Sequence, residues 1–91
     1  MNKQFEEWYW KKHSRAMGFG FFNKLPFSMQ WGVYLEFFDS VGVFISDYPN
    51  STIHKVGFSF KINGRRKTTV YNTRTEAQKE AIKKAFEILE S

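Results

Sequence analysis

The dipeptide Asn63-Gly64 is the feature that most constrains how this chain of 91 residues can fold. Both residues tolerate positive φ, so the pair predicts a two-residue turn that joins two antiparallel strands. The first strand is expected over residues 55–62, where apolar and small or polar residues alternate, and the second over residues 65–71. The apolar face of the first strand consists of Val56, Phe58, Phe60 and Ile62.

The last eighteen residues carry the signals of a capped amphipathic helix. Thr73 and Glu76 form a Thr-x-x-Glu capping box, which predicts that the helix begins directly after Thr73. Its apolar face consists of Ala77, Ala81, Ile82, Ala85, Ile88 and Leu89. Its lysines have glutamates at helical spacing, as in Glu80 with Lys84 and Glu76 with Lys79, so most of its polar face is expected to be solvated.

Residues 27–42 admit two interpretations. As a strand, Trp31 and every second residue after it would alternate with polar or small residues. As a helix, Ser28 would cap the start and Gly42 would follow the last turn. The length of the segment and its end signals favour the helix.

The other elements are shorter. Residues 3–13 predict a helix, residues 18–26 an aromatic loop opened by two glycines, residues 43–48 a strand, and residues 49–52 a turn. The expected fold class is α+β, a three-stranded antiparallel sheet packed against helices in the order α-α-β-β-β-α. We expect one domain over residues 1–91, with an N-terminal helix and aromatic loop in residues 1–24 and the α-β-β-β-α core in residues 25–91.

The net charge of +5 is unevenly distributed along the sequence. Residues 25–53 contain three acidic residues and no Lys or Arg, whereas residues 54–73 contain five basic residues and no acid. Residues 74–91 contain four of each sign and are neutral overall. The positive excess of the second half therefore lies on the predicted hairpin and not on the last helix.

The predicted turn places Lys61 opposite Arg66, Ile62 opposite Arg65 and Phe60 opposite Lys67. Like charges directly opposite each other are unfavourable in a sheet. A cationic hairpin without acids could receive a polyanion such as a phosphate backbone. Arg74, near the start of the last helix, has less acidic compensation than the lysines that follow it. The candidate nucleic-acid-binding residues are Lys55, Lys61, Arg65, Arg66, Lys67, Arg74 and Lys79. The alternative is that these cations only keep an edge strand from pairing with other chains.

The N-terminal aromatic residues offer a different kind of surface. A single short helix cannot bury all three rings of Trp8-Tyr9-Trp10, so at least one is expected to face a loop, another subunit or a partner. The candidate partner-binding residues are Trp8, Trp10, Phe19, Phe21 and Phe22.

Other chemistries have little support in the sequence. There is no Cys, and His13 and His54 lack clustered carboxylates, so neither a metal site nor a catalytic base is expected. No nucleophile can be grouped with a base and an orienting residue, so we expect no enzyme and no cofactor. A charged N-terminus and the lack of a long apolar run predict a soluble cytoplasmic protein without membrane contact.

Two resemblances add to this interpretation. The block of residues 25–45, "LPFSMQWGVYLEFFDSVGVFI", joined to residues 73–90, "TRTEAQKEAIKKAFEILE", resembles small proteins encoded by phages and mobile elements of gut bacteria. That resemblance implies an accessory or host-interaction role and supplies no site residues. Residues 56–89, "VGFSFKINGRRKTTVYNTRTEAQKEAIKKAFEIL", are similar to the last hairpin and helix of the double-stranded-RNA-binding domain. That second resemblance implies contacts with phosphates near the helix start, where Arg74, Gln78 and Lys79 fall.

The expected function is accordingly a non-enzymatic binding module that holds a nucleic-acid backbone on a basic β-hairpin. The alternative is a protein-interaction module or a homo-oligomer that uses the N-terminal aromatic residues.

Overall fold

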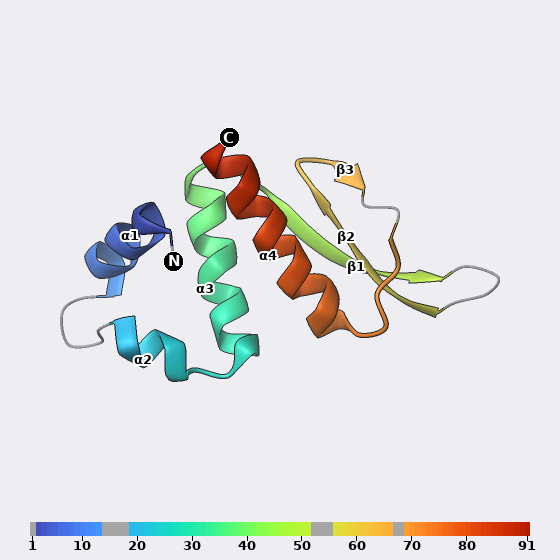
Figure 1. Ribbon diagram of the computed structural model, residues 1–91, viewed down its shortest axis with the longest axis horizontal. Helices are drawn as coiled ribbons and strands as arrows, with labels where there is room; N and C mark the ends of the chain where they lie inside the picture. Colours follow the sequence, from blue (N-terminus) through green and yellow to red (C-terminus); the bar gives the residue numbers. More distant parts are fainter. Residues whose placement is uncertain (1, 14–18, 52–55, 67–68) are drawn as a thin grey trace. The chain divides into compact units, whose positions relative to one another are not determined.

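The protein is described by a computed structural model that covers residues 2–13, 19–51, 56–66 and 69–91. Its chain forms two compact units, Met1–Phe37 and Phe38–Ser91, with the boundary inside a helix. Figure 1 shows the elements along the chain. A single domain over residues 1–91 stays a prediction.

The first unit is helical. Helix α1 spans Lys3–His13, as predicted, α2 spans Phe19–Lys24, and α3 spans Phe27–Ser40, with its first eleven residues in this unit. The side chain of Asn2 caps α1, because its Oδ1 accepts a hydrogen bond of 3.0 Å from the Phe5 N–H.

Because α3 spans Phe27–Ser40, the helix favoured for residues 27–42 is confirmed and the strand interpretation is wrong. The helix begins at Phe27, however, one residue before the predicted cap Ser28.

The aromatic loop expected over residues 18–26 is wrong for the part that the structure describes, because α2 occupies most of it. Phe22 is fully buried, and its ring meets the rings of Phe5 and Tyr34 at centroid distances of 5.4 and 5.3 Å. The amide of Gln30, on α3, donates to the carbonyls of Phe22 and Leu25, both at 3.1 Å. These two hydrogen bonds satisfy carbonyls in the last turn of α2 and directly after it. Tertiary contacts therefore stabilise α2, a short helix that contains a glycine.

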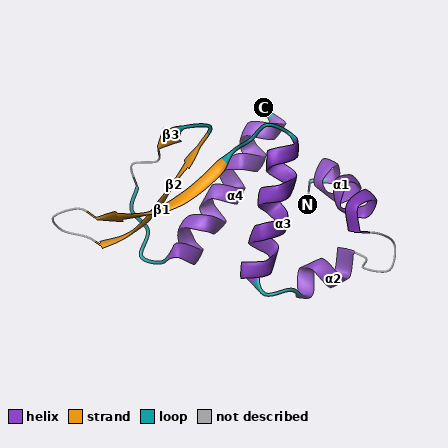
Figure 2. Ribbon diagram, turned by 180° about the vertical axis from the view of Figure 1, so that it is seen from behind, coloured by secondary structure: helices purple, strands orange, loops and turns teal. Residues whose placement is uncertain are grey.

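The second unit is the predicted α+β arrangement. After α3, a turn leads into strand β1, Ile45–Ser51, which pairs antiparallel with β2, Val56–Ile62, and β2 pairs antiparallel with β3, Arg65–Arg66. The sheet order is β1-β2-β3, so β2 is central. Helix α4, Arg74–Glu90, runs along one face of the sheet (Figure 2) and contacts both β1 and β2. The α+β class with three antiparallel strands is thus confirmed.

The predicted ends of these elements are partly right. Gly42, two residues after the end of α3, has φ of 80°, and the Val43 N–H donates to the Phe38 carbonyl at 2.9 Å, so the predicted glycine stop is confirmed. Strand β1 starts two residues later than expected and runs through Pro49–Ser51, where a turn was predicted. Pro49 is compatible with this strand because β1 is an edge strand. Thr52, the last residue of the predicted turn, lies outside the described residues.

Small side chains bring α4 close to the sheet. Ala77, Ala81 and Ala85 recur every fourth residue and are completely buried, as predicted from the periodicity. They oppose the apolar face of β2, where Phe60 and Ile62 are also buried. The predicted face is too wide at its end, since Ile88 is 47% exposed.

The strand expected over residues 65–71 is shorter than predicted. Beyond Arg66 the described chain meets β2 at Thr69, whose carbonyl accepts a hydrogen bond of 3.0 Å from the Ser59 hydroxyl, and pairs with it again at Tyr71, which exchanges two backbone hydrogen bonds with Phe58, at 2.7 and 2.9 Å. From Lys61 to Phe58 the central strand goes back three residues, whereas the returning chain advances five, from Arg66 to Tyr71. The returning chain therefore carries two residues more than a regular ladder would need.

Candidate nucleic-acid interface

The Asn63-Gly64 turn is formed as predicted. Both residues have positive φ, 52° for Asn63 and 81° for Gly64. The Asn63 N–H donates to the Phe44 carbonyl at 2.8 Å, and the Phe44 N–H donates to Asn63 Oδ1 at 2.7 Å. Asn63 therefore forms part of the turn and also connects it by hydrogen bonds to Phe44, directly before β1.

The turn sets the register of the candidate site. Lys61 lies opposite Arg66 and Ile62 lies opposite Arg65, as the sequence predicts. Ile62 is buried on the face of the sheet that holds α4, so alternation puts Arg65 on that same face and puts Lys61 with Arg66 on the other. The two arginines of β3 thus project to opposite faces of the sheet.

Arg66 has an aromatic neighbour on the face away from α4. Tyr48 pairs with Ser59 in the register of β1 and β2, which places it on the same face as Lys61. The guanidinium carbon of Arg66 lies 5.6 Å from the centroid of the Tyr48 ring, a cation–π distance. Sequence reasoning missed this contact, although the alternation of residues 45–48 against β2 could have indicated it.

The cationic hairpin, defined here as Lys61, Arg65 and Arg66, makes no ion pair with an acidic residue in the described part of the chain. Within residues 2–13, 19–51, 56–66 and 69–91, the ion pairs include Lys12–Glu36, Arg74–Asp47 and Lys84–Glu87, at 3.0, 3.6 and 3.3 Å. None of them involves the hairpin. Arg65 and Arg66 are exposed and Lys61 is half-buried. Lys55 and Lys67, also predicted for this site, lie outside the described residues.

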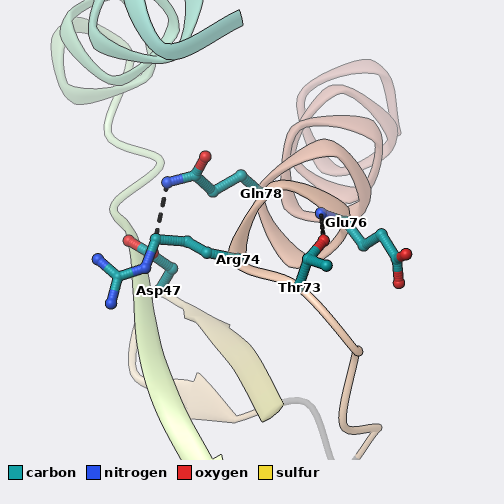
Figure 3. A network of polar contacts seen from close by, with 5 residues as sticks. All are labelled: Asp47, Thr73, Arg74, Glu76 and Gln78. Atoms are coloured by element: carbon teal, nitrogen blue, oxygen red, sulfur yellow. Dashed lines mark hydrogen bonds and ion pairs between the residues drawn. The ribbon is translucent and has the colours of Figure 1, made fainter.

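Arg74 is more compensated than the sequence suggests. Its Nε lies 3.6 Å from Oδ2 of Asp47, a mostly buried carboxylate on β1, and the amide of Gln78 lies 3.4 Å from the same oxygen (Figure 3). The Arg74 guanidinium carbon also lies 5.0 Å from the centroid of the Phe58 ring. The expectation that Arg74 is poorly neutralised is therefore wrong, because a strand distant in sequence supplies an acid.

The start of α4 is capped as predicted. Thr73 has extended backbone angles, and its Oγ1 accepts a hydrogen bond of 3.1 Å from the Glu76 N–H (Figure 3). Lys79 is exposed on the next turn of the helix. Asp47 neutralises part of the positive charge of Arg74 at the start of α4, whereas the cationic hairpin has no such partner among the described residues. The helix start and the hairpin therefore do not form one continuous unneutralised surface.

Along α4, Lys84 pairs with Glu87, a partner that the sequence analysis did not name for it. The ring of Tyr71 stacks on the ring of Phe60 at a centroid distance of 6.0 Å. The charges of Glu80 and Lys84 both affect the pKa of the Tyr71 hydroxyl. Burial raises the pKa of the Tyr71 hydroxyl, the negative charge of Glu80 raises it further, and the positive charge of Lys84 opposes the shift.

The predicted partner-binding residues whose side chains the structure describes differ in exposure. Phe22 is fully buried, so its prediction as an exposed contact residue is wrong for this chain. Trp8 is partly covered by Phe5 and Phe37, with centroid distances of 6.0 and 5.4 Å. Trp10 is 45% exposed. The side chains of Phe19 and Phe21 lie outside the described part of the structure.

A groove lies beside the hairpin, between β2, β3 and the C-terminal half of α4. Its volume is about 210 Å³, and it is lined by Phe60, Ile62, Arg65, Arg66, Lys84 and Ile88. An adjoining hollow of about 350 Å³ shares Ile62, Arg65 and Ile88 and extends to Asn63. The sequence analysis did not predict this groove, because it depends on how α4 crosses the strands.

Among the described residues, no cluster of three His, Cys, Asp or Glu side chains is placed to hold a metal ion. In that same part of the chain, every helix is too short or too polar to cross a bilayer. Comparison with models of protein families, with curated proteins and with solved structures finds no match to this chain.

Proposed function

We propose that this protein is a non-enzymatic module that binds the sugar-phosphate backbone of a nucleic acid through its cationic hairpin. The observation that carries the proposal is the placement of Lys61 directly opposite Arg66, without an acidic partner among the described residues. Such a pair repels itself in the free protein, and a phosphate between the two cations would remove that repulsion. The proposal also places the protein in the cytoplasm, where nucleic acid is accessible.

The geometry favours the hairpin over the start of α4 as the primary contact. In the double-stranded-RNA-binding arrangement, the helix start meets phosphates. Here Asp47 lies 3.6 Å from Arg74 and would repel an approaching phosphate. Protection of an edge strand alone is a weaker explanation for the hairpin, because it accounts for exposed cations but not for two of them in directly opposed positions.

The test is a binding titration by fluorescence anisotropy with labelled duplex RNA, duplex DNA and single strands at low salt. The wild-type protein should bind at least one of them, and affinity should fall linearly with salt on a double logarithmic plot. The double variant R65E/R66E should bind much more weakly, and the salt slope of its residual binding should be shallower by about two, one for each lost phosphate contact.

A matched control is the double variant K11E/K83E, which changes the net charge by the same amount at exposed positions on α1 and α4. It should retain most of the binding if the hairpin is the site. If all three nucleic acids fail to bind the wild-type protein at low salt, the proposal is wrong. If the two double variants lose affinity equally, binding reflects only net charge.

A second candidate function rests on Trp10, whose large ring is 45% exposed and available for contact. It is a protein-interaction role, either with a partner or with a second copy of the chain. Light scattering across a range of concentrations checks the second case. A constant monomer mass would exclude self-association, and a mass that rises for the wild type but not for Trp10→Ala would support it.

A further inference from the structure

The groove beside the hairpin combines two properties that a phosphate-binding surface alone does not need. Its floor is apolar, formed by Phe60 and Ile62 with Ile88, and Ile88 is 47% exposed. Its rim is basic, since Arg65, Arg66 and Lys84 border it. A ligand that fills it must therefore bring an apolar, flat or narrow group together with negative charge.

We infer that this groove receives an unstacked nucleobase, so that the protein prefers single-stranded nucleic acid to a duplex. This inference rests on the proposed function, because the phosphates that flank the base would be held by the cationic hairpin. The groove volume of about 210 Å³ is below the roughly 300 Å³ at which pockets for drug-sized ligands begin, which suits one planar base better than a large cofactor.

The arginines of β3 project to opposite faces of the sheet, so one strand of nucleic acid can contact both the Lys61–Arg66 pair and the groove. Arg66 borders the groove at the edge of the sheet but extends with Lys61 to the face away from α4, where it lies over Tyr48, whereas Arg65 lies on the face with the groove. A flexible single strand that passes around this edge of the sheet places phosphates against both faces and turns a base into the groove. A stiff duplex cannot follow the edge, and its stacked bases would leave the groove uncovered.

The chemistry of the rim fits a base. The guanidinium of Arg65 is planar and can stack on an aromatic base or donate hydrogen bonds to its edge. Lys84, 3.3 Å from Glu87, is partly neutralised and adds less to phosphate binding than Arg65 does. Ile88 supplies exposed apolar surface that a base would cover, and this contact is independent of the sequence of the strand.

The deciding variant is Ile88→Lys, which removes apolar surface and adds a positive charge in one change. If the groove acts only through charge, Ile88→Lys should bind any nucleic acid at least as well as the wild type. If a base occupies the groove, its affinity for single-stranded DNA should fall roughly tenfold, while affinity for a duplex of equal length stays level or rises slightly. The control is Val56→Lys, which adds the same charge at a residue that is 81% exposed at the other end of β2.

Fluorescence anisotropy with a labelled 20-nucleotide oligothymidine, with the matching duplex and with a labelled acidic peptide of alternating Glu and Leu separates the outcomes. A wild-type protein that binds the single strand and the duplex equally, with no loss in Ile88→Lys, would overturn the inference and leave the proposed function standing. A protein that binds neither nucleic acid would overturn both. Binding of the peptide alone, lost in Ile88→Lys, would assign the groove to an acidic protein partner.

Discussion

Lys61 and Arg66 occupy directly opposed positions on β2 and β3, two residues away from the centre of a tight turn. Arg66 also lies over the ring of Tyr48, which holds its charge on the face that Lys61 shares. The turn therefore fixes two like charges next to each other, where a fold selected for stability alone would gain from opposite charges. A conflict between local stability and charge placement of this kind is typical of binding sites.

The first prediction concerns the free energy of unfolding. Lys61→Glu converts the opposed pair into one of opposite charge and should stabilise the protein by roughly 0.5 to 1 kcal/mol at low salt. Lys61→Gln, which only removes the repulsion, should give a smaller gain. Urea denaturation at low and high salt measures both, and added salt should reduce the difference between the variants. Stability that falls in Lys61→Glu at low salt would show that the two cations do not repel each other in the free protein.

The second prediction concerns the close approach of residues 70–71 to β2. A Cβ built at Gly57 would collide with the carbonyl oxygen of Tyr71 and lie 2.9 Å from Cγ1 of Val70, so Gly57→Ala should destabilise the protein by about 2 kcal/mol or more. The control is Gly32→Ala on α3, where the added Cβ meets nothing within 4 Å and should stabilise the helix by about 0.5 to 1 kcal/mol. Thermal denaturation of the two variants checks this. Equal stability would mean that the returning chain does not pack on β2 at Gly57.

The sequence was informative wherever the determining contacts are local. The positive φ of the Asn63-Gly64 turn and the Thr73 cap depend on residues at most three positions apart, and both are confirmed. Periodicity likewise identified the buried alanines of α4. These signals predicted the hairpin register and hence the opposed pair at the centre of the candidate site.

The features that the sequence did not predict depend on contacts across long separations. Helix α2 is held by burial of Phe22 and by the side chain of Gln30, eight residues further along the chain. The neutralisation of Arg74 requires β1 to bring Asp47 to the start of α4, where Gln78 meets it across 31 residues. The groove beside the hairpin requires Ile88 to lie near β3. No pattern of neighbouring residues in the sequence predicts these three contacts.

The third prediction is a loss of stability at high pH. Burial raises the pKa of the Tyr34 hydroxyl above its ordinary value of about 10. Below pH 10 both states keep the proton, but above it the unfolded state loses protons that the folded state retains, so the free energy of unfolding falls as pH rises. Tyr34→Phe should make this fall less steep. Urea denaturation at a series of pH values measures the slope, and an unchanged slope in Tyr34→Phe would exclude Tyr34 as a source of it.

The last prediction uses the contact between Arg74 and Asp47 as a switch for binding. Asp47→Asn preserves the size of the side chain and removes the charge that lies 3.6 Å from Arg74, so the guanidinium becomes available to a phosphate. Affinity for nucleic acid should rise roughly two- to fivefold, and the salt slope should become steeper by up to about one. Because Arg74 is more than half exposed, the lost ion pair should cost well under 1 kcal/mol of stability.

Two controls separate this effect from a general change in net charge. Asp39→Asn alters the charge equally at an exposed residue of α3, so it should leave the salt slope unchanged if Arg74 is responsible. Arg74→Gln added to Asp47→Asn should cancel the gain, because the released cation is then absent. If Asp39→Asn and Asp47→Asn strengthen binding to the same extent, Arg74 makes no phosphate contact, and the hairpin binds its ligand without help from α4.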